Sequence, residues 1–191
     1  LRNNRDISKL DYEITWVYGV IEIVARKVTI TTESKSWSYD ASLHTWEKFD
    51  ASNLVSGHKI SGTLFASIKH YGTVDNSFTP IVLSDHGDVT KNYEFSWNYG
   101  TLKVTGISIE VTTEDAKKEY DGTPLKSTLE QPNITLGSLK DKDIASIKEE
   151  TKSSITYYQD GGIKNTYEIY ISNSDGEDLI NLGDYSVTYK Y

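Results

Sequence analysis

Apolar and polar residues alternate with a period of two through much of this chain. Val28 and Ile30 alternate with Thr29 and Thr31, and Ile109 and Val111 again take alternate positions further along. Successive side chains of a strand point to opposite faces of a sheet. This spacing therefore predicts strands with one buried face, and it is not the spacing of a helix.

The segment of residues 93–104 predicts a hairpin. Aromatic residues stand at alternate positions up to Trp97, and Leu102 and Val104 alternate on what we expect to be a return strand. Between them lies a Tyr-Gly pair, in which Gly100 would accept the positive φ of a tight turn. The sequence thus predicts two antiparallel strands joined at Gly100.

The chain repeats itself with a period near 80 residues. Residues 12–23 match residues 93–104 at a shift of 81, and residues 184–189 begin the motif a third time. Trp16 aligns with Trp97, so we expect both to pack in a core. A period of this length suits a small autonomous domain, and the chain resembles a piece of a longer tandem array. We expect three segments: a C-terminal hairpin of a preceding module or N-terminal extension (1–24), a first β module (25–105) and a second (106–191).

The segments that join these modules are short. Residues 23–26 and 104–107 are mostly apolar, and neither is rich in Gly, Ser or Pro as flexible linkers are. We therefore expect neighbouring modules to be rigidly coupled.

A turn motif differs between the two modules. Residues 120–125 read Tyr-Asp-Gly-Thr-Pro-Leu, in which Asp121 can bond its own downstream backbone and Gly122 can adopt a left-handed conformation. The first module has Ala41 and Ser42 in the corresponding places. We expect backbone strain or a different turn type there.

These patterns predict an all-β fold of tandem small antiparallel modules, each resembling a β-sandwich. The alternative is a β-grasp-like sheet, which is disfavoured because no amphipathic segment reaches normal helix length. Ile144 and Ile147 would suit one helical turn, but the aligned segment of the first module alternates like a strand. We expect a strand there.

Composition excludes several kinds of chemistry. The 191 residues contain no cysteine, which rules out disulfides, thiolate metal sites and thiol catalysis. A net charge of −8 opposes binding to nucleic acid, which needs clustered Lys and Arg. No run of 18 apolar residues could span a membrane, since the most apolar stretch is interrupted by Gly19 and Glu22. We expect a monomer without a cofactor.

Residues 120–125 and 92–105 together resemble a known family. They are similar to the tandem surface repeats of Gram-positive bacterial proteins grouped with YGX-type MBG (mucus-binding-type) domains. The resemblance implies a secreted, cell-wall-attached adhesin at the bacterial surface. Two departures are that the first module lacks the Gly-Thr-Pro of the opening turn, and that the sequence stops at Tyr191, before the Gly-Thr-Leu return strand.

Two loops are the candidate cation sites. Residues 84–88 and 173–178 place oxygen-bearing side chains around a glycine, but neither matches the longer ligand pattern of an EF-hand. Polar hairpin loops favour the same residues, so we expect no metal site. The weak calcium candidates are Asp85, Asp88, Asp175 and Asp178.

Histidine and tryptophan give the other candidates. All four histidines lie in the first module and none forms a short ligand pair, so we expect loop or surface positions; they are His44, His58, His70 and His86. Trp37 and Trp46 do not recur in the second module. Either could stack on a sugar ring if exposed, although capping of a local core is the simpler expectation.

No enzyme motif is present, because the sequence has no nucleophile elbow, phosphate loop or nucleotide fingerprint. We expect a non-catalytic structural stalk of a surface adhesin. The alternative is a ligand-binding adhesin module that recognises a host glycan or protein. An exposed aromatic cluster would favour that alternative.

Overall fold

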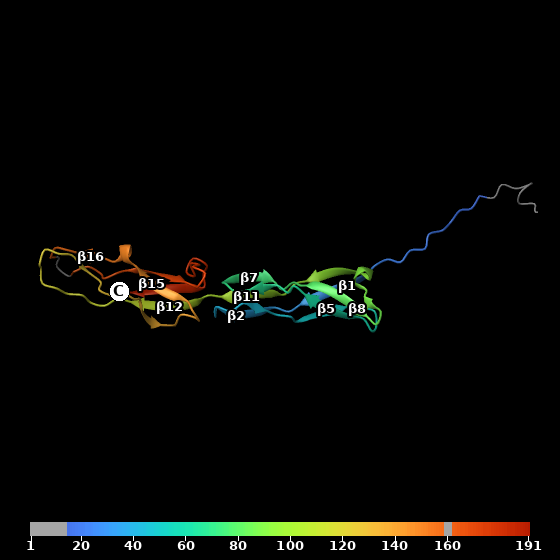
Figure 1. Cartoon of the computed structure of the whole chain (residues 1–191), viewed down its shortest axis with the longest axis horizontal. Coiled ribbons are helices and arrows are strands. Elements are labelled where there is room, and N and C mark those ends of the chain that lie inside the picture. The colour runs from blue at the N-terminus through green and yellow to red at the C-terminus, as the bar shows by residue number, and fades with distance from the viewer. Residues whose placement is uncertain (1–14, 159–161) are drawn as a thin grey trace, which may run out of the picture.

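The computed structural model describes residues 15–158 and 162–191, which form an elongated all-β molecule (Figure 1). Strands make up 45% of it and helical residues 3%, the latter in the 3₁₀ turns Thr90–Asn92 and Glu149–Thr151. The all-β prediction is confirmed. Within the described residues no helix is long and apolar enough to cross a membrane.

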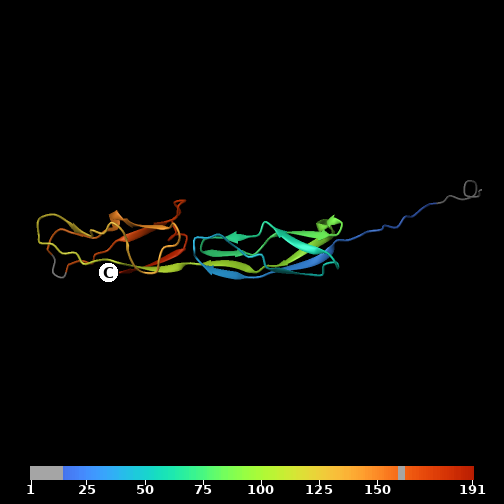
Figure 2. The ribbon, with the colours of Figure 1, turned by 60° about the horizontal axis from the view of Figure 1, so that its bottom comes forward.

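The first module consists of two lobes that follow one another along the long axis (Figures 1 and 2). In its N-lobe, the sheet β10-β1-β4 faces the sheet β5-β8-β9; in its C-lobe, the sheet β2-β11-β7 accompanies the pair β3-β6. The strands are β1 (Arg26–Thr32), β2 (Lys35–Ser38), β3 (His44–Thr45), β4 (Phe49–Ser52), β5 (Lys59–Thr63), β6 (Ser67–Ile68), β7 (Gly72–Asp75), β8 (Thr79–Ser84), β9 (Gly87–Asp88), β10 (Tyr93–Asn98) and β11 (Thr101–Thr105).

The predicted hairpin at residues 93–104 is wrong. β10 pairs in parallel with β1, and β11 pairs in parallel with β2 at the same sequence separation of 67 residues. A parallel ladder in one register, interrupted at residues 32–34, thus joins the first two strands of the module to its last two. Gly100 does not make a turn; it allows the backbone of residues 99–101 to lie close to that of Glu33. A Cβ on Gly100 would lie 2.4 Å from the carbonyl carbon of Glu33.

The N-terminal segment also departs from its hairpin prediction. Residues 1–14, including Tyr12 and Ile14, lie outside the described residues, and residues 15–25 are extended without strand pairing. The expected core position of Trp16 is wrong, because its side chain is 71% exposed. Trp97 instead is half-buried, with its ring edge-on to that of Phe78.

The second module repeats this plan in part. Its N-lobe contains the sheet β14-β12-β18 and the pair β15-β17, and its C-lobe contains the pair β13-β16. The expected strand at residues 144–147 is confirmed as β15. The strands are β12 (Ile107–Thr112), β13 (Leu125–Lys126), β14 (Asn133–Leu136), β15 (Ile144–Lys148), β16 (Ser154–Ile155), β17 (Glu168–Ser172) and β18 (Tyr185–Lys190). β12 pairs with β18 in parallel, as β1 does with β10.

The hydrophobic core is divided inside the first module, not between the modules. One cluster fills the N-lobe, with Val28 and Ile30 of β1 against Val82 of β8. A second cluster begins with Leu102 of the C-lobe and continues across the module boundary to Ile109. Because apolar burial is the main favourable term in folding, the two modules share part of their stability.

The expected strain in the first module's turn is confirmed. Ala41 has a φ of 66°, close to the 80° of Gly122 at the equivalent position. A side chain in the left-handed region costs about 1–2 kcal/mol. The turn is held by the Asp40 carboxylate, which accepts a hydrogen bond from the backbone N–H of Ser42 at 2.9 Å.

Gly100→Ala should destabilise the first module by about 1–3 kcal/mol, the usual cost of overpacking, because its Cβ would meet backbone that cannot swing away. The matched control is Gly19→Ala at the same motif position, where no atom lies within 4 Å. Urea unfolding of both variants measures the difference. Equal stabilities would show that the ladder tolerates a side chain at this crossing.

Candidate functional site

The module junction brings polar side chains of both modules together. β11 passes through Gly106 directly into β12, so a single residue links the modules. A Cβ on Gly106 would lie 2.2 Å from the carbonyl oxygen of Gly183. Glycine at position 106 therefore allows the connecting strand to lie directly against the loop that precedes β18.

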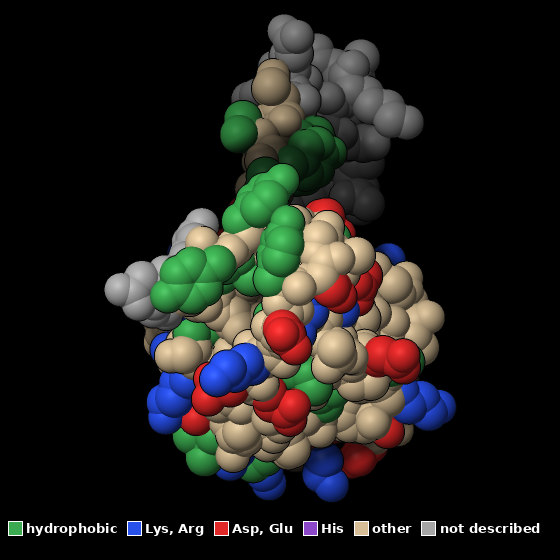
Figure 3. Space-filling view, turned by 90° about the vertical axis from the view of Figure 1, so that its left-hand side faces the viewer, with side chains coloured by type: hydrophobic (Ala, Val, Ile, Leu, Met, Phe, Trp, Pro, Cys, Tyr) green, Lys and Arg blue, Asp and Glu red, His purple; other side chains and the backbone are tan. Residues whose placement is uncertain are grey.

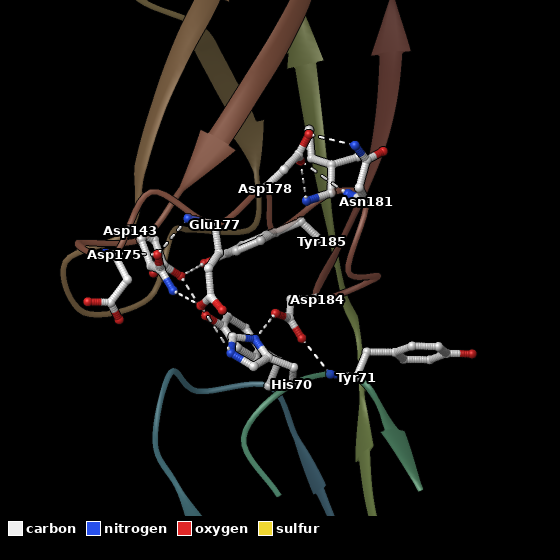
Figure 4. A network of polar contacts seen from close by, with 12 residues as sticks. His70, Tyr71, Asp143, Asp175, Glu177, Asp178, Asn181, Asp184 and Tyr185 are labelled. Atoms are coloured by element: carbon white, nitrogen blue, oxygen red, sulfur yellow. Dashed lines mark hydrogen bonds and ion pairs between the residues drawn. The ribbon is translucent and has the colours of Figure 1, made fainter.

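A buried carboxylate from the second module holds the first. The Asp184 side chain is fully buried, and its Oδ1 accepts the backbone N–H of Tyr71 at 2.6 Å. Its Oδ2 lies 2.6 Å from Nδ1 of His70 (Figure 4). Both oxygens of one side chain are thus satisfied by two successive residues of the other module, which fixes position and orientation together.

Two tyrosines meet beside this carboxylate. The rings of Tyr39 and Tyr185 contact edge to face with centroids 5.5 Å apart, although they belong to different modules. Both hydroxyls donate to Oδ2 of Asp143, at 3.2 Å from Tyr39 and 2.7 Å from Tyr185. An aromatic pair of this geometry adds about 0.5–1.5 kcal/mol beyond the area it buries.

The surroundings of the two phenols keep them protonated. Burial raises the pKa of Tyr39 well above its usual range, and the negative charge of Asp143 raises it further. Burial also raises the pKa of Tyr185, with its hydrogen bond to Asp143 as the next cause. Each neutral hydroxyl can therefore keep donating to the carboxylate at any physiological pH.

This arrangement favours rigidity over reaction. Interfaces between domains are flexible by default unless they are large and apolar, and here an apolar core crosses the boundary. A buried charge is costly when its partners are lost, so the network around Asp184 discriminates against other module angles. The chemistry that the junction supports is recognition of one module by the next.

The two loops named as calcium candidates are closed by their own polar groups. Asp88 Oδ1 accepts from the backbone N–H of Thr90 at 2.9 Å, in the turn that follows Asp85 and β9. Asp178 Oδ1 likewise accepts from the N–H of Ile180 at 3.1 Å, at the end of the loop that holds Asp175. In the described residues no three His, Asp or Glu side chains gather as a metal would require.

The two non-recurring tryptophans are both half-buried and covered. Trp37 stacks on His44 with ring centroids 4.6 Å apart, and it packs against the shared core. Trp46 donates from Nε1 to Glu33 at 3.2 Å, and the ammonium of Lys35 lies 4.8 Å above its ring. The structure thus places neither ring face freely open to a sugar.

The histidines are dispersed, and one of them lies in the junction. His58 Nδ1 lies 2.5 Å from the hydroxyl of Tyr93, and His44 bonds Asp40. His70 bonds Asp184 and places its Nε2 3.4 Å from Glu177 (Figure 4). His86 lies in the exposed turn between β8 and β9.

Sequence reasoning missed most of this junction. It weighed His70 only as a metal ligand and gave no role to Asp143, whose position carries no local pattern. The repeat was the available signal, because Asp184 and Tyr185 open the third copy of the aromatic motif. Gly106 and Gly183, 77 residues apart, were not paired because only the folded chain brings their backbones together.

No family model matches this chain, and comparison with curated proteins and with solved structures finds no match either.

Asp184→Ala should cost about 1–3 kcal/mol, because it removes the buried acceptor of both the Tyr71 N–H and the His70 ring. The matched control is Asn92→Ala, since Asn92 precedes β10 as Asp184 precedes β18 but is exposed. Urea unfolding of the two variants gives the comparison. A loss below about 0.5 kcal/mol for Asp184→Ala would mean that the contact contributes nothing to the junction.

The two tyrosines should stop stabilising the junction in strong alkali. The raised pKa values of Tyr39 and Tyr185 mean that their stabilising effect is complete below the ordinary tyrosine pKa of about 10 and is lost as the pH rises through their folded values. At about pH 11, absorbance at 295 nm of the native chain should equal that of the variant with Tyr39→Phe and Tyr185→Phe. A lower absorbance in the variant would show that at least one of the two phenols is ionised in the native state at this pH.

Proposed function

We propose that this chain forms non-catalytic stalk modules of an extracellular adhesin that is attached to a bacterial cell wall and projects a distal binding domain. The single observation that carries this proposal is the parallel ladder that joins the first and last strands of each module.

The ladder has the geometry of a load-bearing element. Tension along the chain enters the first module at Arg26, where β1 begins, and leaves it at Thr105, where β11 ends. These points lie at opposite ends of the ladder, because Arg26 pairs with Tyr93 and Ser38 pairs with Thr105. The force therefore acts along the strands and loads all the ladder hydrogen bonds at once, instead of opening them one after another.

The junction extends this resistance from one module to the next. Force passes from β11 to β12 through Gly106, beside the buried Asp184 network. A core shared across the boundary opposes bending as well as stretching. A stiff junction is what a spacer needs, because a flexible chain of modules would not hold its tip away from a surface.

The adhesin and cell-wall parts of the proposal rest on the resemblance of residues 92–105 and 120–125 to Gram-positive surface repeats. The net charge of −8 and the lack of cysteine are compatible with an extracellular bacterial protein. The rival function, recognition of a host glycan or protein, is supported by one observation. Exposed tyrosines, among them Tyr120, Tyr157 and Tyr158, gather at the end of the second module.

Single-molecule force spectroscopy tests the stalk function. The chain contains no cysteine, so two introduced cysteines are unique handles. Lys27→Cys with Lys103→Cys pulls on opposite ends of the ladder and should unfold the first module at a force several-fold higher than Lys27→Cys with Glu94→Cys. The latter pair is the matched control, because Lys27 and Glu94 lie directly opposite each other at one end. Equal unfolding forces would contradict a load-bearing ladder.

A further inference from the structure

His70 contacts two acidic side chains of the second module, one with each ring nitrogen. Its Nδ1 lies 2.6 Å from Oδ2 of Asp184, and its Nε2 lies 3.4 Å from Oε2 of Glu177. Figure 4 shows the imidazole between these two carboxylates, with the backbone of Tyr71 bonded to the other oxygen of Asp184. Both contacts cross the module boundary, so the charge of one ring affects how the two modules hold each other.

The geometry fits a ring that is protonated on both nitrogens. An ionised carboxylate only accepts hydrogen bonds, and an imidazole nitrogen donates one only when it carries a proton. Since a carboxylate faces each nitrogen of His70, both contacts are favourable only for the imidazolium form. Its positive charge also offsets the negative charge of Asp184, whose side chain is fully buried and would be costly as an isolated anion.

The two contacts respond differently to the loss of one proton. A neutral imidazole keeps a single N–H, and its other nitrogen becomes an acceptor. The N–H should stay on Nδ1, because the buried Asp184 cannot turn to water, whereas Glu177 is 46% exposed. The neutral Nε2 would then face the carboxylate of Glu177 as one acceptor against another. The contact with Asp184 therefore survives in both states, and the contact with Glu177 does not.

Glu177 connects His70 to the loop between β17 and β18. Asn173 organises this loop, because its Oδ1 accepts from the backbone N–H groups of Asp175 and Glu177, each at 3.0 Å. Its Nδ2 donates to the same carboxylate oxygen of Glu177 that faces His70. The side chain of Asp175 points away from the ring (Figure 4). Loss of the contact with His70 would free the loop from the first module and leave its internal hydrogen bonds in place.

We propose that His70 and Glu177 form a pH-sensitive latch, which fastens the loop of residues 173–178 to the first module while His70 is protonated and releases it when the ring becomes neutral. Histidine in model peptides titrates at about pH 6.5. The latch stabilises the junction in the protonated state, and this contribution is lost as the pH rises through the titration of His70.

The other ionisable groups near His70 come from both modules. The ring of Tyr39 stacks against it with centroids 6.2 Å apart, and Tyr185 contacts Tyr39 in turn. Both hydroxyls donate to Asp143, and Lys69 precedes His70 in the chain. Carboxyl, phenol and ammonium groups ordinarily titrate outside the neutral range, and burial raises the pKa of Tyr39 and Tyr185 further from it. Imidazole is thus the group here whose ordinary titration falls near neutral pH.

Histidine occurs in the first module and not in the second. Figure 3 looks onto the far end of the second module, where acidic and basic side chains are mixed and no histidine appears among the described residues. The second module therefore meets an imidazole only through its neighbour. The three other histidines of the first module also titrate near neutral pH, so a test must compare variants that share them.

The inference goes beyond the stalk function and does not rest on it. It depends on the contacts of one imidazole and not on the ladder. Loss of force resistance would leave the latch intact, and a junction without pH dependence would leave the load-bearing ladder intact.

Distances between spin labels test the latch in the whole chain. The sequence has no cysteine, so Thr73→Cys on β7 and Ser174→Cys on the loop, both at exposed positions, each take one label. The distance distribution should be narrow at about pH 5.5, where histidine is ordinarily charged. At about pH 9 the population outside the main peak should rise about three- to tenfold, as the loss of one partly exposed charged contact allows. Equal distributions at the two pH values would overturn the proposal.

Two variants identify the groups that respond. His70→Asn keeps a side-chain N–H for Asp184 but has no second nitrogen and no charge. Glu177→Gln keeps the length of the side chain, and its amide can pair with either form of the ring. Each variant should give the same distance distribution at both pH values. A pH response that persists in either of them would belong to another group and would overturn the latch.

A second label pair is the matched control. Thr73→Cys with Thr188→Cys on β18 reports the orientation of the modules without the loop, and both positions are exposed. Its distance should not change with pH, because Asp184 keeps its contact with Nδ1 of His70 in both states. Equal broadening in this pair would mean that the whole junction opens, which would overturn a latch confined to the loop.

Nitrogen NMR of the His70 ring reads its charge directly. Both nitrogens should carry protons at about pH 5.5, and Nδ1 alone should carry one at about pH 9. A neutral ring protonated on Nε2 would overturn the division of roles between Asp184 and Glu177.

Discussion

The parallel ladder between the first and last strands of each module is the interaction on which the rest of the structure depends. It starts at the pair Arg26 and Tyr93 and keeps one register to the pair Ser38 and Thr105, so it spans both lobes. Two further strands of the first module pair with its sides, β4 with β1 and β7 with β11. Pairing is interrupted between Thr31 and Lys35, and there glycine at position 100 lets two backbones approach within the space of a side chain.

Continuity of the ladder explains why the modules are not independent domains. The last strand of the first module, β11, continues through Gly106 into β12, the first strand of the second module. The core of the first C-lobe therefore extends into the second N-lobe. Apolar burial makes this contact favourable, but it is not directional. The two carboxylate oxygens of the buried Asp184 contact His70 and Tyr71, and these directional contacts fix the orientation of one module relative to the other. Stability and alignment are thus provided by different groups at the same junction.

The sequence alone determined the strand content, the tandem repeat and the strained turn at Ala41, because these follow from alternation, self-similarity and local backbone preferences. It did not determine strand partners. Residues 93–104 suit a hairpin or a continuing parallel strand equally well, since alternation reports which face is buried and not which neighbour is bonded. The junction also needed the fold, because Asp143, Asp184 and His70 are far apart in the chain and have no shared motif. Only tertiary structure brings them together, and only their burial turns ordinary polar residues into a specific contact.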